Sequence, residues 1–525
     1  MQELFYGGTI LTMTNPLTAE ALLAEDGRIL AVGDKSSLSA LASPGCRRTD
    51  LGGRTLMPAF IDPHSHFVQA AASQLQLSVN GAENAEEIAR RVREFIDERQ
   101  LPEGQWVMVR DYDNNLMPGC QNPTLSQLDA MAPRNPMVVT HKSGHMGFLN
   151  SRGLEKMGIT ARTPQPEGGR IGMEDGRLTG YLEENAFISI TKKLPGPGPE
   201  ELVQGVRAAQ QLYLSHGITT AQEGMVPREL LGAYQFLQSK DLPKIDVRLY
   251  PDTASFTEAV KLFGRAPVEK NLRVGGIKIF LDGSPQGRTA WMRRPYEGSE
   301  DYCGYGTMTD EAVLEAMAMA AQQNCQIIAH CNGDAAAEQF LRCLEKAEQT
   351  YPCLRELRPV LIHAQLMGRD QLPRAARLGA MASFFAAHVY HWGDVHIRNF
   401  GPDRAGVISP AKSALECGLR FTFHQDAPVI EPDMMETIWC AVNRVTRAGR
   451  ELDDEKISVL EALKAVTVNG AYQYFEEDSK GILAPSYRAD LVILDRDPLQ
   501  VPPGELRDVQ VEATYKDGVC LYRRG

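Results

Sequence analysis

The sequence predicts an α/β protein whose main body is a (β/α)8 TIM-type barrel. Short apolar runs alternate with amphipathic stretches through the middle of the chain, as expected for parallel strands covered by helices. Eight such runs occur, and eight is the number of strands that closes a β/α barrel. Both ends of the 525-residue chain instead consist of short β-like runs punctuated by glycine, which predicts a small composite β-sandwich domain formed by the two termini.

The composite β-sandwich is predicted over residues 1–57 and 473–525. In "DGRILAVG" the Asp26-Gly27 pair indicates a tight turn before an apolar strand. "KDGV" near the C-terminus has the same pattern and predicts a second hairpin. The first residues contain no basic segment leading into a long apolar core, so we expect no signal peptide.

The barrel is predicted over residues 58–66 and 213–472. Its first strand lies in "LMPAFIDPHSHF", from Leu56 to Phe67. The other seven strands are expected in "GITTAQE", "IDVRLYPD", "RVGGIKIFLDG", "CQIIAH", "RPVLIH", "AMASFFAAH" and "LRFTFHQD". Stretches such as "DEAVLEAMAMAAQQN" and "LPRAARLGA" have the apolar spacing of helices that cover a sheet.

Residues 67–212 separate the first predicted strand from the second. This interval contains "NAEEIARRVREFIDERQ" and "NPMVVTHKSGHMGFLNS", which are too regular for a loop. We therefore expect an inserted α+β subdomain over the barrel mouth, where such segments usually shape a substrate pocket.

Five of the predicted strands carry side chains that can bind a metal or move a proton. They are His64 and His66 on the first strand, Lys278 on the fourth, His330 on the fifth, His363 on the sixth and Asp426 on the eighth. Because the carboxyl ends of barrel strands converge on the mouth of the barrel, we expect these side chains to lie close together.

Strand periodicity strengthens this expectation. His64 and His66 share one face of an extended segment, so both can point at one ion. A His-x-His pair alone is weak evidence, since it is more often a surface or structural feature. Lys278 discriminates better, because an amine inside an apolar strand is costly to bury unless it is paired or chemically changed. The alternative is a lysine whose chain extends outward to solvent.

Composition excludes several functional classes. The net charge of −12 and the lack of a basic cluster argue against a nucleic-acid partner, so the expected partner is a small-molecule substrate. The ten cysteines are scattered without CxxC pairs, which indicates a reducing compartment and predicts a cytoplasmic protein. No uninterrupted apolar run is long enough to cross a membrane.

Five segments together carry a family resemblance: "MPAFIDPHSH", "GIKIFLDGSPQGRTA", "IIAHCNGDAAAEQF", "RPVLIHAQ" and "HQDAPV". They resemble the amidohydrolase superfamily of metal-dependent hydrolases. "HKSGHMGFLNSRGL" and "DGSPQGRTA" resemble more narrowly its YtcJ-like branch, which includes deformylases of N-substituted formamides. The resemblance covers nearly the whole chain and implies the same barrel and composite β-sandwich.

The resemblance also implies a divalent metal centre of one or two ions, with zinc foremost and iron, manganese or cobalt as alternatives. The implied ligands are His64, His66, Lys278, His330 and His363. Lys278 would act directly or as a carbamate formed with CO₂. Asp426 is implied as general base and then general acid for a metal-bound hydroxide that attacks an amide-type carbon. His145 would help to polarise the carbonyl group.

Further candidates concern the substrate. The branch pattern GHxxxxN implies that His145 and Asn150 face the pocket, and Glu183 resembles an acid of the branch near the site. Asp282 and Arg288 follow the fourth strand and either position substrate or form an internal ion pair that shapes their loop.

Histidines after the seventh strand are also candidates. His388 and His391 are expected to touch substrate, whereas His396 is expected to be exposed. Gln286 and the pair His424-Gln425 depart from the branch pattern and are expected to line the mouth.

The favoured function is metal-dependent hydrolysis of an amide-type C–N bond in a small molecule. A deaminase, or a non-hydrolytic lyase or isomerase on the same metal site, is the alternative within enzymes. A metal-free binding protein is a third possibility, but it would have no physical need for the strand-buried Lys278. A homodimer is the expected oligomeric state.

Overall fold

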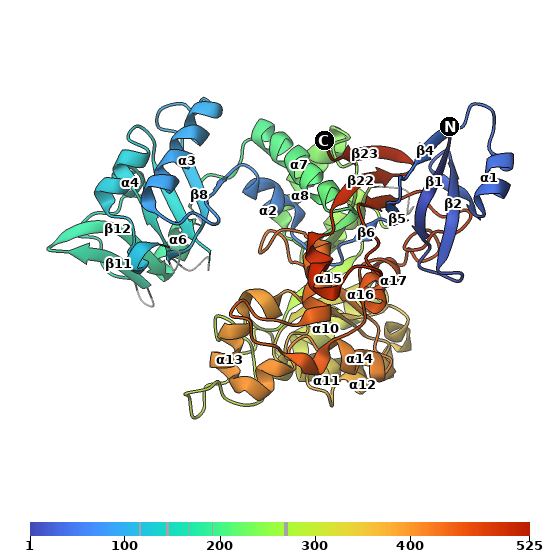
Figure 1. Ribbon diagram of the computed structural model, residues 1–525. Coiled ribbons are helices and arrows are strands. Elements are labelled where there is room, and N and C mark those ends of the chain that lie inside the picture. Colours follow the sequence, from blue (N-terminus) through green and yellow to red (C-terminus); the bar gives the residue numbers. More distant parts are fainter. Residues whose placement is uncertain (115–116, 143–145, 167–168, 192, 267–270) are drawn as a thin grey trace. The chain divides into compact units, whose positions relative to one another are not determined.

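The computed structural model describes residues 1–114, 117–142, 146–166, 169–191, 193–266 and 271–525. The chain divides into two compact units (Figure 1). The larger unit consists of Met1–Ala70 and Val206–Gly525, and the smaller unit of Ala71–Gly205. The predicted domain bounds, and the position of an insertion over a barrel mouth, stay predictions.

Parallel strands form the centre of the larger unit, as two sheets. The first has the order β15 (Leu272–Val274), β14 (Asp246–Pro251), β13 (Ile218–Val226) and β6 (Phe60–Ile61). The second has the order β16 (Gly276–Phe280), β17 (Gln326–Cys331), β18 (Val360–His363), β19 (Met381–Phe384) and β20 (Phe421–Phe423). Each of the eight predicted apolar runs therefore contains a strand, and all neighbours pair in parallel.

The fourth predicted strand is split between the two sheets at Gly275. This residue donates its N–H to the Leu249 carbonyl at 2.9 Å, and a Cβ added there would lie 2.7 Å from the Tyr250 ring. On the other side, the buried Gln473 amide donates to the Pro63 carbonyl (2.9 Å) and accepts from the Thr422 hydroxyl (2.8 Å). The chain itself passes from one sheet to the other at Gly275, and the Gln473 amide is one of the side chains that connect them.

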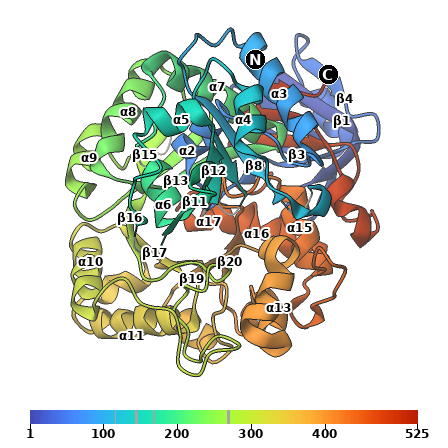
Figure 2. The ribbon, with the colours of Figure 1, turned by 90° about the vertical axis from the view of Figure 1, so that its left-hand side faces the viewer.

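Helices lie outside these strands, as Figure 2 shows for α8, α9, α10, α11 and α13. Their bounds are α8 (Arg228–Ser239), α9 (Phe256–Phe263), α10 (Asp310–Gln322), α11 (Asp334–Thr350), α12 (Leu372–Arg377), α13 (His388–Gly406), α14 (Ala411–Glu416), α15 (Met434–Asn443), α16 (Val459–Ala465) and α17 (Val468–Gln473). The predicted helix at 310–324 is confirmed as α10, where the Thr309 side chain caps the first turn by accepting from the Ala312 N–H at 3.3 Å. Apolar residues from several strands and α17, among them Ile61, Ile328 and Ile362, form a core cluster.

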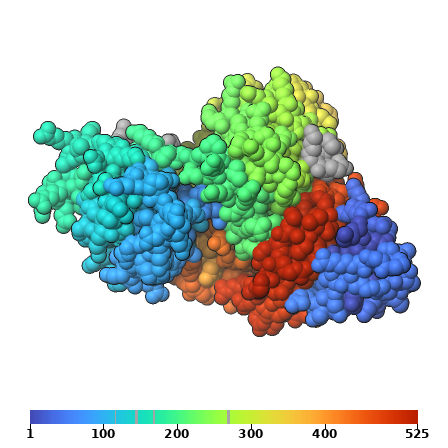
Figure 3. All heavy atoms as spheres, turned by 90° about the horizontal axis from the view of Figure 1, so that it is seen from above, coloured from blue at the N-terminus to red at the C-terminus, as the bar shows by residue number. Residues whose placement is uncertain are grey.

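Strands of both termini form one eight-stranded sheet. Its main path is β23 (Val519–Arg523), β22 (Val511–Lys516), β21 (Leu491–Leu494), β5 (Thr55–Pro58), β1 (Gln2–Leu11), β2 (Thr18–Glu25) and β3 (Arg28–Gly33), with β4 (Arg47–Asp50) paired to β1 and α1 (Lys35–Leu41) beside β2. Figure 3 shows red C-terminal residues lying against dark blue N-terminal ones. Both predicted hairpins are confirmed: Asp26-Gly27 joins β2 to β3, and Asp517-Gly518 joins β22 to β23, with φ between 46° and 84°.

A buried network of charges joins this sheet to the parallel strands. The Asp246 carboxylate of β14 lies 3.1 Å from Lys516 Nζ of β22 and 3.2 Å from the Arg488 guanidinium. The Glu476 carboxylate lies 2.5 Å from both Arg248 and Arg273. A misplaced partner would leave a buried charge unpaired. These ion pairs therefore favour one particular arrangement of the terminal sheet and the parallel strands.

The smaller unit has its own six-stranded sheet, in the order β11 (Gly169–Glu174), β12 (Arg177–Glu184), β10 (Met146–Leu149), β9 (Met137–His141), β8 (Val107–Tyr112) and β7 (Leu77–Ser78). Its helices include α3 (Ala85–Glu98), α4 (Leu125–Met131), α5 (Ser151–Lys156) and α6 (Asn185–Thr191), while α2 (Phe67–Ser73) and α7 (Pro199–Ser215) contain the boundaries between units. α3 begins where the Asn84 side chain accepts from the Glu87 N–H at 2.8 Å. Among the described residues, no helix is both long and apolar enough to span a bilayer.

Candidate metal centre

Three of the predicted residues meet at the carboxyl ends of β6 and β20. The Nε2 atoms of His64 and His66 each lie 3.5 Å from Asp426 Oδ1, and one ligand atom from each residue lies within 4.8 Å of the others. A hydrogen bond of 2.8 Å from the His66 N–H to the Ala427 carbonyl connects the two segments. The first and last parallel strands therefore bring two imidazoles and a carboxylate to one point.

Gln222, in the middle of β13, determines which His64 nitrogen faces that point. Its Nε2 donates to the Pro63 carbonyl at 2.7 Å and to the Tyr474 hydroxyl at 3.2 Å, so its Oε1 faces His64 Nδ1 at 2.6 Å. An amide oxygen only accepts, so His64 carries its proton on Nδ1 and directs the Nε2 lone pair toward Asp426.

Glu223, the next residue, acts in the same way on His66. This fully buried carboxylate accepts from the Tyr234 hydroxyl (2.6 Å) and the Val68 N–H (2.8 Å), and its other oxygen lies 3.5 Å from His66 Nδ1. Burial opposes a charged His66, but the Glu223 hydrogen bond and the Asp426 and Glu223 charges raise its pKa overall. Sequence reasoning missed both second-strand residues, although their position at a strand end in "TTAQEG" was a usable signal.

His330 and His363 form a second pair of ligand atoms. His330 Nδ1 lies 3.1 Å from His363 Nε2, and the His64 and His363 ring centroids are 5.4 Å apart. Burial, with the nearby Lys278 charge, lowers the pKa of His330 to about 3, and burial lowers that of His363 well below its usual range. Both rings are therefore neutral at pH 7 and can act as lone-pair donors.

The backbone turns sharply at two of these strand ends. His363 and Asp426 have φ values of 71° and 56°, a left-handed conformation that non-glycine residues rarely adopt. Strained backbone of this kind persists where surrounding packing enforces it, and it is concentrated at functional sites.

Lys278 lies inside β16 and is only 1% exposed, so the alternative of a lysine extending to solvent is wrong. Its Nζ lies 4.9 Å from the centre of the Phe280 ring. Burial lowers the pKa of Lys278 to about 7, although the Asp426 charge acts in the opposite direction. Burial also raises the pKa of Asp426, so the protein holds an amine and a carboxyl group that each resist carrying charge.

These residues fit a divalent cation. Within the described ranges, Lys278 Nζ and Asp426 Oδ1 are buried without a hydrogen-bond partner. Unpartnered buried polar atoms are costly, and a metal ion would remove that cost by accepting their lone pairs or those of the neutral imidazoles beside them. Imidazole nitrogens with carboxylate oxygens are ligands for zinc and for several other transition metals.

The predicted substrate residues of the fourth-strand loop have internal partners instead. Asp282 accepts from the backbone N–H groups of Trp291 (3.0 Å), Asn332 (2.9 Å) and Gly333 (2.7 Å). Arg288 donates to the Glu297 carbonyl at 3.0 Å and lies over the Tyr296 ring. Asp282 thus organises this region through backbone amides, and the substrate roles of Asp282 and Arg288 stay predictions.

The histidines of α13 are also engaged. His388 Nδ1 lies 3.1 Å from His396 Nε2, and neither ring is more than 4% exposed, so the expectation of an exposed His396 is wrong. His391 Nε2 lies 3.1 Å from a carboxylate oxygen of Glu436. Phe385 and Trp392 pack against His388, and the substrate roles of His388 and His391 stay predictions.

Three predicted residues belong to the smaller unit. Asn150 is 1% exposed: its Oδ1 accepts from the Met137 and Gly153 N–H groups at 2.9 Å, and its Nδ2 donates to two carbonyl groups. The bond from Gly153 caps α5, and the other three fix the Asn150 side chain to neighbouring backbone; its role in a pocket stays a prediction. Glu183 accepts from the Tyr181 hydroxyl. His145 lies outside the described residues.

Two of the unusual residues, His424 and Gln425, are fully buried. Gln425 donates to the Thr437 hydroxyl of α15 at 2.8 Å, and His424 lies behind His363. The expectation that this pair lines the mouth is therefore wrong.

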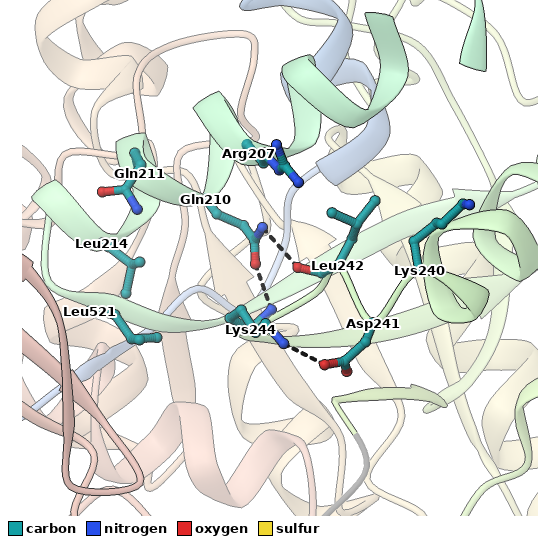
Figure 4. Close-up of a pocket in the computed structure, with 9 residues that line it drawn as sticks. All are labelled: Arg207, Gln210, Gln211, Leu214, Lys240, Asp241, Leu242, Lys244 and Leu521. Carbon is teal, nitrogen blue, oxygen red and sulfur yellow. Dashed lines mark hydrogen bonds and ion pairs between the residues drawn. The ribbon is translucent and has the colours of Figure 1, made fainter. Parts of the chain in front are cut away.

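A separate hollow of about 450 Å³ lies near the amino end of β14, away from the carboxyl ends of the strands (Figure 4). Gln210 donates to the Leu242 carbonyl at 3.0 Å and accepts from the Lys244 N–H at 2.5 Å. Lys244 also pairs with Asp241. Since no imidazole lines this hollow, it offers none of the chemistry of the strand carboxyl ends.

Imidazoles, a buried amine and a carboxylate at the carboxyl ends of parallel strands are typical of metal-dependent hydrolases. The sequence model of the Amidohydrolase family matches residues 48–522, and the chain belongs to this family. It is therefore an enzyme of the hydrolase class that acts on carbon–nitrogen bonds other than peptide bonds.

Individual relatives cover almost the whole chain. N-substituted formamide deformylase of Arthrobacter pascens is 29% identical over 96% of this chain and 95% of its own length. The putative amidohydrolase YtcJ of Bacillus subtilis (strain 168) is 27% identical over all of both chains. The crystal structure of an uncharacterized metal-dependent hydrolase from Pyrococcus furiosus is similar at a TM-score of 0.77 and 25% identity, covering 95% of this chain and 100% of that one.

Proposed function

We propose that this enzyme hydrolyses the amide-type C–N bond of a small molecule, with an N-substituted formamide as the first candidate substrate. The observation that carries the proposal is the meeting of His64, His66 and Asp426, with His330 and His363 beside them. The full-length similarity to a deformylase supports the substrate class. We also propose that the two parallel sheets close into a (β/α)8 barrel and that the terminal sheet belongs to a composite β-sandwich.

The proposed ligands of one or two divalent ions, with zinc foremost, are His64, His66, Lys278, His330 and His363. When bound, such an ion supplies Lewis acidity, which acidifies water and polarises a carbonyl group. A buried amine whose pKa is about 7 has a substantial neutral fraction at pH 7, and the neutral form adds CO₂, which supports a carbamate on Lys278.

Asp426 is proposed to move the proton. Hydrolysis adds a water oxygen to the carbonyl carbon, breaks the C–N bond and requires a proton on the leaving nitrogen. The Asp426 side chain is 15% exposed and faces His64 and His66, so it can reach both the water and a substrate. It would accept the water proton and then deliver it to nitrogen, and a raised pKa suits the second step.

A product assay with metal analysis tests the proposed function. Purified enzyme should contain a divalent metal, and N-methylformamide in oxygen-18 water should yield labelled formate and methylamine. Ammonia released from a substrate with an exocyclic amino group, with N-methylformamide left intact, would favour the deaminase, and a product without the label would favour a lyase or isomerase. Protein that neither retains nor takes up a divalent metal would favour the metal-free binding protein.

Two further proposals concern the setting of the enzyme. All ten cysteines are unpaired, which supports a reducing, cytoplasmic compartment. A homodimer stays our proposal for the oligomeric state, and light scattering of the purified chain would test it.

A further inference from the structure

A line of three side chains crosses the second sheet behind the proposed metal centre. His424, just after β20, places its Nε2 3.0 Å from His363 Nδ1 on β18. Its other nitrogen, Nδ1, lies 2.8 Å from the Ser383 hydroxyl on β19. Ser383 and His424 are fully buried and His363 is 4% exposed, so water does not compete for these hydrogen bonds.

The hydrogen bonds of this line restrict where the protons lie. His363 can direct an Nε2 lone pair toward His330 only if its own proton is on Nδ1. That proton must then be donated to His424 Nε2, so His424 carries its proton on Nδ1 and donates it to the Ser383 oxygen. Every hydrogen bond in this arrangement has one donor and one acceptor.

Reversing all the protons gives a second complete arrangement. The Ser383 hydroxyl then donates to His424 Nδ1, His424 donates to His363 Nδ1, and His363 carries a proton on Nε2, directed at His330 Nδ1. In this arrangement His363 offers no lone pair to a cation. Because a hydroxyl both donates and accepts, Ser383 can terminate either arrangement.

We propose that Ser383 and His424 are positioning residues that accept, in relay, the hydrogen bond of a His363 protonated on Nδ1, and thereby set how tightly the His330–His363 half of the centre holds a divalent ion. This inference rests on the proposed function, since it assumes that the centre binds metal. Residues outside a ligand shell that orient a ligating histidine typically change metal affinity about 10–100-fold when they are removed.

The main test is Ser383→Ala in the full-length enzyme. Alanine cannot accept from His424 Nδ1, so the arrangement that frees His363 Nε2 leaves a buried N–H without a partner. We expect Zn²⁺ titration of metal-depleted protein, with a competing chelator, to show about 10–100-fold weaker binding than wild type. Ser383→Thr keeps a hydroxyl and should restore most of the affinity.

Ser409→Ala is the matched control, because Ser409 is equally buried and its hydroxyl bonds to Gln365 and to the Phe385 carbonyl rather than to a histidine. It should bind Zn²⁺ as wild type does. Ser383→Cys, nearly the same shape with a weak acceptor, serves if Ser383→Ala does not fold, and it should also bind more weakly.

Imidazole nitrogen-15 chemical shifts give a second readout that does not depend on activity. Adding Zn²⁺ to wild type should place the protons of His363 and His424 on Nδ1. Wild-type affinity in both Ser383→Ala and Ser383→Cys, or a His363 that keeps its Nε2 proton with Zn²⁺ bound, would overturn the inference. If wild type itself binds no divalent metal, it is the proposed function that fails.

Discussion

Asp426 and Lys278 have opposite charge types in a centre from which water is largely excluded. Burial raises the pKa of Asp426 and lowers that of Lys278, while their mutual attraction acts against both shifts. The raised pKa of Asp426 favours its second proposed step, the delivery of a proton to the leaving nitrogen. The two groups have separate proposed roles, and substitutions can distinguish them.

Asp426→Asn should reduce turnover about 10²–10⁴-fold, because an amide cannot take the proton of water. The four histidines and Lys278 remain, so metal content should survive. Kinetics with N-methylformamide and metal analysis of the same preparation check both statements. Asp370→Asn, at a carboxylate 68% exposed to solvent, is the control and should be active. Undiminished turnover in Asp426→Asn would refute the assigned role.

Lys278→Ala should weaken metal binding about 10-fold or more, since it removes a proposed ligand from the buried side of the centre. Added acetate or propionate should recover part of the metal content if a carbamate is the native ligand, because a small carboxylate supplies equivalent oxygens. Metal content measured with and without propionate checks this. Full metal binding in the variant would contradict the role of Lys278 as a ligand.

At the scale of elements, three consecutive residues of β13 position the two histidines that follow β6. Gln222 and Glu223 orient His64 and His66, and Gly224 leaves room for the His64 ring. A Cβ added to Gly224 would lie 2.8 Å from His64 Nδ1 and closer still to Cε1. β13 thus determines the tautomers of His64 and His66 and leaves room for the His64 ring.

Gly224→Ala should therefore displace the His64 ring and lower turnover about 100-fold, as a misplacement approaching 1 Å can do. Gly232→Ala in α8 is the control, since nothing lies within 4 Å of the added Cβ. It should leave activity unchanged and stabilise the helix by about 0.5–1 kcal/mol. The test compares the metal affinity and turnover of the two variants. Equal activity in both would show that the His64 ring tolerates the methyl group.

At the scale of the whole larger unit, stability depends on the buried charges that join the terminal sheet to the parallel strands. Burial alone would raise the pKa of Glu476, but Arg248, Lys480 and Arg273 lower it below its ordinary value of 4.5. The folded chain then binds fewer protons at this site than the unfolded chain. Its contribution to stability is present above about pH 4.5 and is lost as the pH falls further.

Glu476→Gln should cost about 3–5 kcal/mol of unfolding free energy at pH 7, because it leaves buried cations without their counter-charge. It should also flatten the loss of stability below pH 4.5, since the titrating group is gone. Urea unfolding at pH 7 and pH 4 measures both effects. Glu94→Gln, in an exposed pair with Arg90, should change stability by less than about 1 kcal/mol, and a similar cost in both variants would argue against the network.

The sequence by itself determined the features that depend on strand periodicity and strand ends. The sequence predicted that six side chains meet, because alternation fixes the face of each residue and parallel strands place their carboxyl ends together. These are His64, His66, Lys278, His330, His363 and Asp426. The hairpins at Asp26-Gly27 and Asp517-Gly518 were equally local, since positive φ at both positions selects those residues.

Only the tertiary structure decided the partners of individual polar side chains. Asn150, Asp282 and His396 have internal partners, namely backbone amides, carbonyl groups or a ring, that no local spacing reveals, and the burial of His396 contradicts its predicted exposure. Conversely, Gln222, Glu223, Ser383 and the role of His424 were missed. A hydrogen bond joins two atoms across strands, and its existence depends on distances of about 3 Å that only the packed fold determines.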